Sequence, residues 1–292
     1  MNYRHAFHAG SFADVVKHAV LARILVQLSG KPTAFRVIDT HAGAGLYDLT
    51  GEEAQRGGEW RTGIARMLNA KFAAPVRALL KPYLDAVRAL NSAGALRTYP
   101  GSPALTRALL RPQDRLVACE LEPRAAAALS RHFAHDKRIK TVAIDGWIAL
   151  NAYIPPVERR GVVVIDPPFE DASDFVKLAQ GLKAAHRKWA RGVYLVWYPI
   201  KRRQEPDALA HSLKRTGINK ILRAELAVAP PLAQGPLGGC GLIVVNPPFT
   251  LEGELAAILP ALSAILAQPS GSHRLDWIAT EREFRTFSTP PL

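Results

Sequence analysis

Short runs of apolar, largely β-branched residues recur along the chain, and stretches with helical spacing separate them. Strands are expected over 35–39, 115–120, 141–145, 161–166, 193–199, 221–228 and 240–246. The first four runs are continuously apolar, which is typical of parallel strands covered on both faces. Helices are expected over 13–27 (amphipathic, with Ser11 or Asp14 near its start), 123–134, 171–189, 205–216 and 251–267. Alternating strands and helices indicate an α/β, Rossmann-like sheet.

Two connections depart from this alternation. Residues 40–114 separate the first two strands, although one crossover helix needs far fewer. We therefore expect a small helical insertion over 48–104, with a helix over 74–91, and a main domain made of 1–47 and 105–280 before a tail at 281–292. The Pro/Gly-rich loop 229–239 is too short for a crossover. The sequence thus predicts seven strands, mostly parallel, with an antiparallel last strand.

The charge balance points to an anionic partner. The chain has 38 Lys and Arg against 25 Asp and Glu, a net charge of +13. Nucleic acid is the usual partner of such a protein, because each neutralised phosphate releases counterions. A basic surface without a specific role is the alternative.

The remaining composition excludes several classes of protein. The two cysteines lie alone in apolar runs, which excludes a disulfide framework and a cysteine-rich zinc site. No apolar run reaches the roughly 18–20 residues of a membrane helix, and the start lacks a signal-peptide pattern. We expect a cytoplasmic monomer with no membrane contact and no protein partner.

The first expected strand ends in the sequence DTHAGAG, which begins at Asp39. Gly43 and Gly45 allow a tight turn and the close approach of a ligand to the backbone. A dinucleotide-binding loop would carry a third glycine where this chain has Asp48. The acid followed by two glycines favours a loop for S-adenosylmethionine over one for a nicotinamide cofactor, although a glycine turn can also be purely structural.

Acids also end the second and third expected strands. Glu120 is placed to accept hydrogen bonds from ribose hydroxyls, with Glu122 as a local rival. Asp145 could accept from an adenine amino group, and the Gly146 backbone could complete the contact with that base. Each acid is equally compatible with a solvated strand end or an ordinary Asp-Gly turn.

The fourth strand ends in DPPF, which is the most specific of these signals. The two prolines fix the backbone, so the Asp166 carboxylate, the Pro167 carbonyl and the Phe169 ring come together at the sheet edge. These groups suit a flat base with an exocyclic amine. The motif NPPF, from Asn246, also fits the amine-methylation pattern, and by its letters it fits better than DPPF. If the last strand is antiparallel, however, Asn246 lies on the edge away from the ligand loop.

The histidines near the N-terminal end and the first strand raise the question of a metal. The chain lacks the closed Cys/His spacing of a structural zinc site, and amine methylation needs no metal. We expect no metal, and hydrogen bonding or helix packing as the role of these side chains: His5, His8, His18 and His41.

Together these motifs resemble the RlmJ family of bacterial 23S rRNA adenine-N6 methyltransferases, which have a class I methyltransferase fold. The resemblance rests on YRHAFHAGSFADVVKH from Tyr3, DTHAGAG, YPGSP, DPPF and WYP, and it runs from residue 3 to about 280. Phe169 stands where tyrosine is commoner, which keeps a stacking ring but loses a hydroxyl.

The resemblance implies specific roles for individual residues. Asp166 would be catalytic, with Pro167 and Phe169 around the base. Tyr3 and His5 are expected near the RNA, and Lys201 and Arg202 could hold phosphates or lie in a solvated loop. The implied S-adenosylmethionine contacts are Lys17, His18, His41, Gly43, Ser102, Glu120, Asp145, Gly146 and Asp166. Ser102, followed by Pro103, is also expected to cap a helix.

The expected function is therefore methylation of an adenine N6 amine in 23S rRNA. Two alternatives stay open: another RNA or a DNA as the substrate of the same chemistry, and a non-catalytic RNA-binding protein on a methyltransferase fold.

Overall fold

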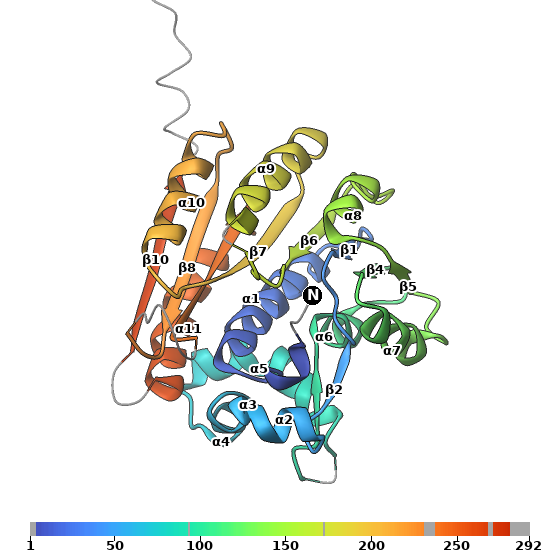
Figure 1. Ribbon diagram of the computed structural model, residues 1–292, viewed down its shortest axis with the longest axis vertical. Helices are drawn as coiled ribbons and strands as arrows, with labels where there is room; N and C mark the ends of the chain where they lie inside the picture. The colour runs from blue at the N-terminus through green and yellow to red at the C-terminus, as the bar shows by residue number, and fades with distance from the viewer. Residues whose placement is uncertain (1–3, 93, 172, 231–236, 268–270, 281–292) are drawn as a thin grey trace, which may run out of the picture.

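The structure is a computed structural model, and it describes residues 4–92, 94–171, 173–230, 237–267 and 271–280. Its centre is an eight-stranded sheet in the order β10-β8-β9-β7-β6-β1-β4-β5 (Figure 1). The five neighbours β7, β6, β1, β4 and β5 run parallel. The strands are β1 (Arg36–Asp39), β4 (Arg115–Glu120), β5 (Ile139–Ala143), β6 (Gly161–Ile165), β7 (Val193–Pro199), β8 (Ile221–Ala227), β9 (Gly239–Val245) and β10 (Ser272–Ala279).

Two layers of helices cover the sheet, because alternate strand residues point to opposite faces. Val37, Val162 and Val164 pack on one side with helices α1 (Phe12–Ser29), α5 (Ala74–Ala89), α6 (Ser102–Leu109), α7 (Pro123–Phe133) and α11 (Leu251–Leu266). Ile38 and Val163 pack on the other side with α8 (Gly146–Ala152), α9 (Ser173–Lys188) and α10 (Gln204–Lys214). Helices cover both faces of the sheet, which explains the continuous apolar runs in its strands.

Helix α1 is buried on nearly all sides, so the expectation of an amphipathic helix was wrong. It packs against α5, α6 and α11 as well as β9. Ser11 is its N-cap and accepts a hydrogen bond from the Asp14 amide, as its position predicted. The polar residues Asp14, Lys17 and His18 are therefore carried into the interior rather than into solvent.

The long interval after β1 holds a small two-stranded sheet of β2 (Leu46–Asp48) and β3 (Thr98–Pro100), with helices between these strands. The helices are α2 (Glu52–Gly57), α3 (Glu59–Thr62), α4 (Ile64–Asn69) and α5. Pro82 lies inside α5 without ending it. In Figure 1 this insertion, light blue to cyan, lies beside α1. The small sheet was not predicted, and the domain boundaries stay a prediction.

Several boundaries differ from the expectations. The sheet has eight strands rather than seven, because β10 pairs antiparallel with β8. Strand β9 is antiparallel to both β7 and β8, as the short connection predicted. Strand β5 ends two residues before Asp145, which instead caps α8. Ser102 is the first residue of α6, and Gly101 occupies the cap position.

Candidate active site

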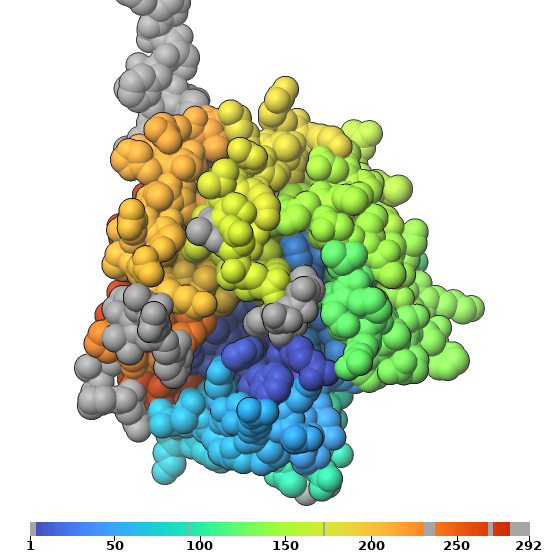
Figure 2. All heavy atoms as spheres, viewed as in Figure 1, coloured from blue at the N-terminus to red at the C-terminus, as the bar shows by residue number. Residues whose placement is uncertain are grey.

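The carboxyl ends of the parallel strands border a cavity of about 740 Å³. Figure 2 shows this face hollowed between the dark-blue N-terminal segment and the green and yellow-green segments around it. The glycine loop after β1, the start of α1, the end of β6 and the end of β7 all contribute to the lining. In parallel α/β sheets this edge is where ligands bind. The lining includes His5, Lys17, His18, His41, Gly43, Ser102, Glu120, Asp166, Pro167, Phe169 and Lys201.

The glycine loop and Glu120 hold each other in place. Glu120 accepts hydrogen bonds from the amide of Gly43 (2.7 Å) and from that of Glu122 (2.8 Å). Gly43 has a φ of +62°, and a Cβ there would lie 2.1 Å from the Tyr47 hydroxyl, so the loop requires glycine. The rival Glu122 caps α7 by accepting from the Ala125 amide. Glu120 is therefore a strand-end acceptor positioned by the backbone.

His41 forms another part of the cavity wall. Its ring packs edge-on against Trp147, with the ring centroids 5.6 Å apart, and Nδ1 lies 2.8 Å from the Thr40 hydroxyl. Burial lowers the pKa of His41 to about 4, so the ring is neutral at pH 7. A Cβ on Gly146 would lie 2.5 Å from His41 Nε2, which explains the glycine. Gly146 and Asp145 border His41 but do not themselves line the cavity.

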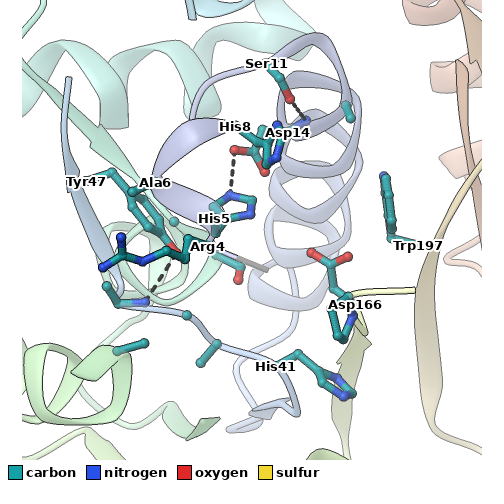
Figure 3. Close-up of a pocket in the computed structure, with 18 of the residues that line it drawn as sticks. Arg4, His5, Ala6, His8, Ser11, Asp14, His41, Tyr47, Asp166 and Trp197 are labelled. Atoms are coloured by element: carbon teal, nitrogen blue, oxygen red, sulfur yellow. Dashed lines mark hydrogen bonds and ion pairs between the residues drawn. The ribbon is translucent and has the colours of Figure 1, made fainter. Parts of the chain in front are cut away.

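A buried ion cluster joins the start of α1 to the end of β6. Lys17 Nζ lies 2.5 Å from Asp166 Oδ2 and 3.0 Å from Asp14 Oδ1. Asp14 also binds His5 Nε2 at 3.0 Å and the Gly10 amide at 3.0 Å. In Figure 3 the Asp166 carboxylate faces α1, and His5 meets Asp14 on the same side.

The charges in this cluster are fixed by their neighbours. Burial acts to lower the pKa of Lys17, but the carboxylates of Asp14 and Asp166 raise it well above its usual value. Burial acts to raise the pKa of Asp14, but His5 and Lys17 hold it well below its usual range. Lys17 is thus cationic and Asp14 anionic at pH 7. Asp14 was noticed in the sequence only as a helix-start residue, although its spacing of three from Lys17 is that of a helical ion pair.

Aromatic rings stand beside Asp166. Phe169 has a φ of +49° and packs against Phe175 and Trp197, at ring-centroid distances of 4.8 and 5.8 Å. Phe169 and Trp197 both line the cavity, and Figure 3 shows Trp197 next to Asp166. The turn after β6 therefore places Asp166, Pro167 and Phe169 in the lining of one cavity. Trp197 was known from the sequence only as part of WYP.

Of the remaining residues predicted for the site, one lines the cavity and one does not. Lys201 lines the cavity, whereas Arg202 is exposed and does not. The neighbouring Arg203 is bound to Glu225 (2.7 Å) and Asp207 (2.8 Å). Tyr3 lies outside the described residues.

In the described part of the chain, no group of three or more His, Cys, Asp or Glu residues could hold a metal ion. The same residues include no helix long and apolar enough to cross a membrane.

Known proteins resemble this chain over most of its length. The family model described as ribosomal RNA large subunit methyltransferase D, RlmJ, matches residues 32–279. The chain belongs to the RlmJ family. Ribosomal RNA large subunit methyltransferase J of Escherichia coli K12 is 41% identical over 282 residues, and its namesake from Haemophilus influenzae is 38% identical over 283. Each alignment covers 96% of this chain and all of the relative.

The solved structure of a Legionella pneumophila protein has a similar fold. It is 32% identical, has a TM-score of 0.85, and the match covers 92% of this chain and 98% of that one. The RlmJ family predicted from the motifs is thereby confirmed, as is the class of fold.

The second motif of this RlmJ-family chain lies on the opposite edge of the sheet. Because β9 runs antiparallel to β7, its last residue pairs near the start of β7 and away from the cavity. The Asn246 amide group donates to the carbonyls of Ala190 and Gly192, both at 2.8 Å. Asn246 therefore closes the turn before β7, and the topological argument against it is confirmed.

We predict that Asn246→Ala lowers the free energy of unfolding by about 1–3 kcal/mol, because two carbonyls lose their donor. Alanine is also disfavoured at the φ of +51° that Asn246 adopts. Urea denaturation checks this, with Asn69→Ala as the control, since Asn69 donates to a single exposed helix carbonyl. Equal stability of the two variants would contradict the structural role.

Proposed function

We propose that this protein transfers a methyl group from S-adenosylmethionine to the N6 amine of an adenine in 23S rRNA. The observation that carries the proposal is the position of DPPF. Asp166 and Phe169 stand at the carboxyl edge of β6, in one cavity with Glu120 and His18. Both curated relatives are named as methyltransferases of large-subunit ribosomal RNA, which supports RNA as the substrate.

The residues of the cavity fit such a donor. Its volume lies within the several hundred Å³ typical of cofactor sites. Glu120 offers a carboxylate for ribose hydroxyls, and the buried Nε2 of His18 has no hydrogen-bond partner among the described residues. The other contacts expected from the family are Lys17, His41, Gly43, Ser102, Asp145, Gly146 and Asp166. When bound there, the sulfonium supplies an already activated methyl group.

The chain must then position the amine and stabilise the charge that develops on it. The Asp166 carboxylate and the Pro167 carbonyl can each accept one N6 hydrogen, which turns the nitrogen lone pair towards the methyl carbon. Alignment of this kind is worth up to about 7–11 kcal/mol. As the N–C bond forms and the S–C bond breaks, Asp166 stabilises the cationic nitrogen. The methylated aminium is acidic enough to lose its proton to water afterwards.

The base itself must leave its stack to reach Asp166, at a cost of a few kcal/mol. Stacking on Phe169, with Trp197 alongside, offsets about 1–3 kcal/mol of this. Lys17 already binds Oδ2 of Asp166, and this contact orients the carboxylate before the base arrives. The N6 hydrogen bond can use the other oxygen.

The deciding test supplies purified protein with labelled S-adenosylmethionine and unmodified 23S rRNA, tRNA or double-stranded DNA. We expect N6-methyladenosine from 23S rRNA alone, identified by mass spectrometry of nucleosides. Label in tRNA or DNA would retain the chemistry and refute the substrate. Binding of neither donor nor RNA would refute the proposal, and binding of RNA without the donor would favour a non-catalytic RNA-binding protein.

A matched pair of substitutions tests the DPPF assignment. Asp166→Ala should lower kcat by at least about 10²–10³-fold, because the developing charge loses its partner. Asn246→Ala removes the corresponding side chain of the second motif and should keep the wild-type kcat. Wild-type turnover of the Asp166 variant, or an inactive but folded Asn246 variant, would reverse the assignment.

Lys201 and Arg202 are tested through salt dependence. If each contacts a phosphate, its replacement by alanine should weaken RNA binding and reduce the slope of log K against log salt by about 1. Lys188→Ala is the control, because Lys188 ends α9 at the opposite edge of the sheet. Filter binding at several salt concentrations measures the slopes. Equal slopes for all three variants would place these two residues in a solvated loop.

A further inference from the structure

A chain of three buried side chains connects the insertion to the cavity. His18 Nδ1 lies 2.7 Å from the Tyr99 hydroxyl, and that hydroxyl lies 2.9 Å from the hydroxyl of Tyr83. All three residues are fully buried. Tyr83 comes from α5 and Tyr99 from β3, so both belong to the insertion, whereas His18 belongs to α1. The far side of the His18 ring, Nε2, has no partner among the described residues.

The hydrogen bonds that join Tyr83, Tyr99 and His18 can run in two directions, which differ in the hydrogen that is left unpaired. Burial lowers the pKa of His18 to about 3, so the neutral ring carries a single N–H at pH 7. In the described part of the chain, the Tyr83 hydroxyl has a hydrogen-bond partner only in Tyr99. If Tyr83 donates to Tyr99, the Tyr99 hydrogen goes to His18 Nδ1, and the ring hydrogen must be on Nε2. The opposite direction leaves the hydroxyl hydrogen of Tyr83 without an acceptor, and Tyr83 does not line the cavity. The first direction leaves the Nε2 hydrogen of His18 unpaired instead, and His18 does line the cavity, so a bound ligand can supply the missing acceptor only there.

The surroundings of His18 favour an anionic ligand group. His18 lines the cavity together with Gly101 and Ser102, at the N-terminal end of α6, where negative charge is favourable. The neighbouring cation, Lys17, is already bound by Asp14 and Asp166. An Nε2–H at this place is therefore a donor with no acceptor on the described protein.

The proposed ligand has one group that meets this need. With its ribose at Glu120 and its methyl group at Asp166, the amino-acid end remains for the region of His18. That end carries an ammonium, which only donates hydrogen bonds, and a carboxylate, which accepts them.

We propose that Tyr83 and Tyr99 of the insertion fix the tautomer of His18, so that Nε2–H donates to the carboxylate of S-adenosylmethionine. This inference rests on the proposed function for the identity of the ligand. The two tyrosines are positioning residues, because they act on the ligand through His18. The insertion thereby takes part in recognising the methyl donor.

The tautomer can be measured in the free protein. Long-range ¹H–¹⁵N correlation spectra of protein labelled at histidine distinguish a ring protonated at Nε2 from one protonated at Nδ1. A variant with His18→Asn identifies the His18 signals. We expect an Nε2–H tautomer in the wild type, and loss of this single form in Tyr99→Phe. An Nδ1–H tautomer in the wild type overturns the inference.

Ligand binding tests the carboxylate. Calorimetry compares S-adenosylmethionine with its decarboxylated analogue for the wild type, Tyr99→Phe and Tyr83→Phe. We expect Tyr99→Phe to weaken binding of S-adenosylmethionine about tenfold and Tyr83→Phe to weaken it about threefold, which corresponds to the loss of one modest hydrogen bond. Neither substitution should alter the affinity for the analogue.

Tyr194→Phe is the matched control, because it removes an equally buried hydroxyl that donates to two carbonyls at the end of α9. It should leave both affinities unchanged. Equal losses for the two ligands in Tyr83→Phe and Tyr99→Phe would place the contact elsewhere and overturn the inference. If the wild type binds neither ligand, the proposed function is refuted. If it binds both ligands while His18 is protonated at Nδ1, only the inference about Tyr83, Tyr99 and His18 is refuted.

Discussion

The ion cluster of Lys17 between Asp14 and Asp166 is the interaction on which the site depends. A buried lysine is costly unless its charge is compensated, and here two carboxylates compensate it. One of them belongs to the same helix and the other to the end of β6. The cost of separating these charges therefore fixes α1 against the carboxyl edge of the sheet. This contact brings the start of α1 and the DPPF turn into one cavity.

The burial of α1 follows from the insertion. A helix that covered the sheet alone would keep a solvated face, but α5 of the insertion packs on α1 together with α6 and α11. Arg23 ends inside this packing, where its guanidinium forms two hydrogen bonds with Glu254 of α11. Polar residues of α1 therefore bind side chains of neighbouring elements, as Lys17 binds Asp166 and Arg23 binds Glu254. The insertion is consequently part of the architecture of the cavity, whichever ligand occupies it.

Local patterns predicted the elements that are buried on both faces. The runs at β4 and β7 were found at their observed bounds because short, mostly apolar stretches of this length are typical of buried strands. Strand β10 was missed because it is an edge strand whose first residues are exposed, so its sequence, SHRLDWIA, lacks an apolar run. The burial of α1 was predicted wrongly because the helical pattern shows only which positions are apolar. The helices that cover its polar positions belong to other parts of the chain.

The residues of the site also differ in how far the sequence predicted them. Asp166, Glu120 and Gly43 were predictable because each follows a recognisable strand, and strand ends of a parallel sheet converge on one edge. Tyr83 carries no such signal, since its contact with Tyr99 depends on how α5 packs on α1. The two PPF motifs make the distinction clearest. Their letters favoured Asn246 over Asp166, and only the direction of β9 assigned Asp166 to the cavity and Asn246 to a turn. Chemistry that depends on strand direction can be inferred from connection lengths, whereas chemistry that depends on helix packing requires the structure.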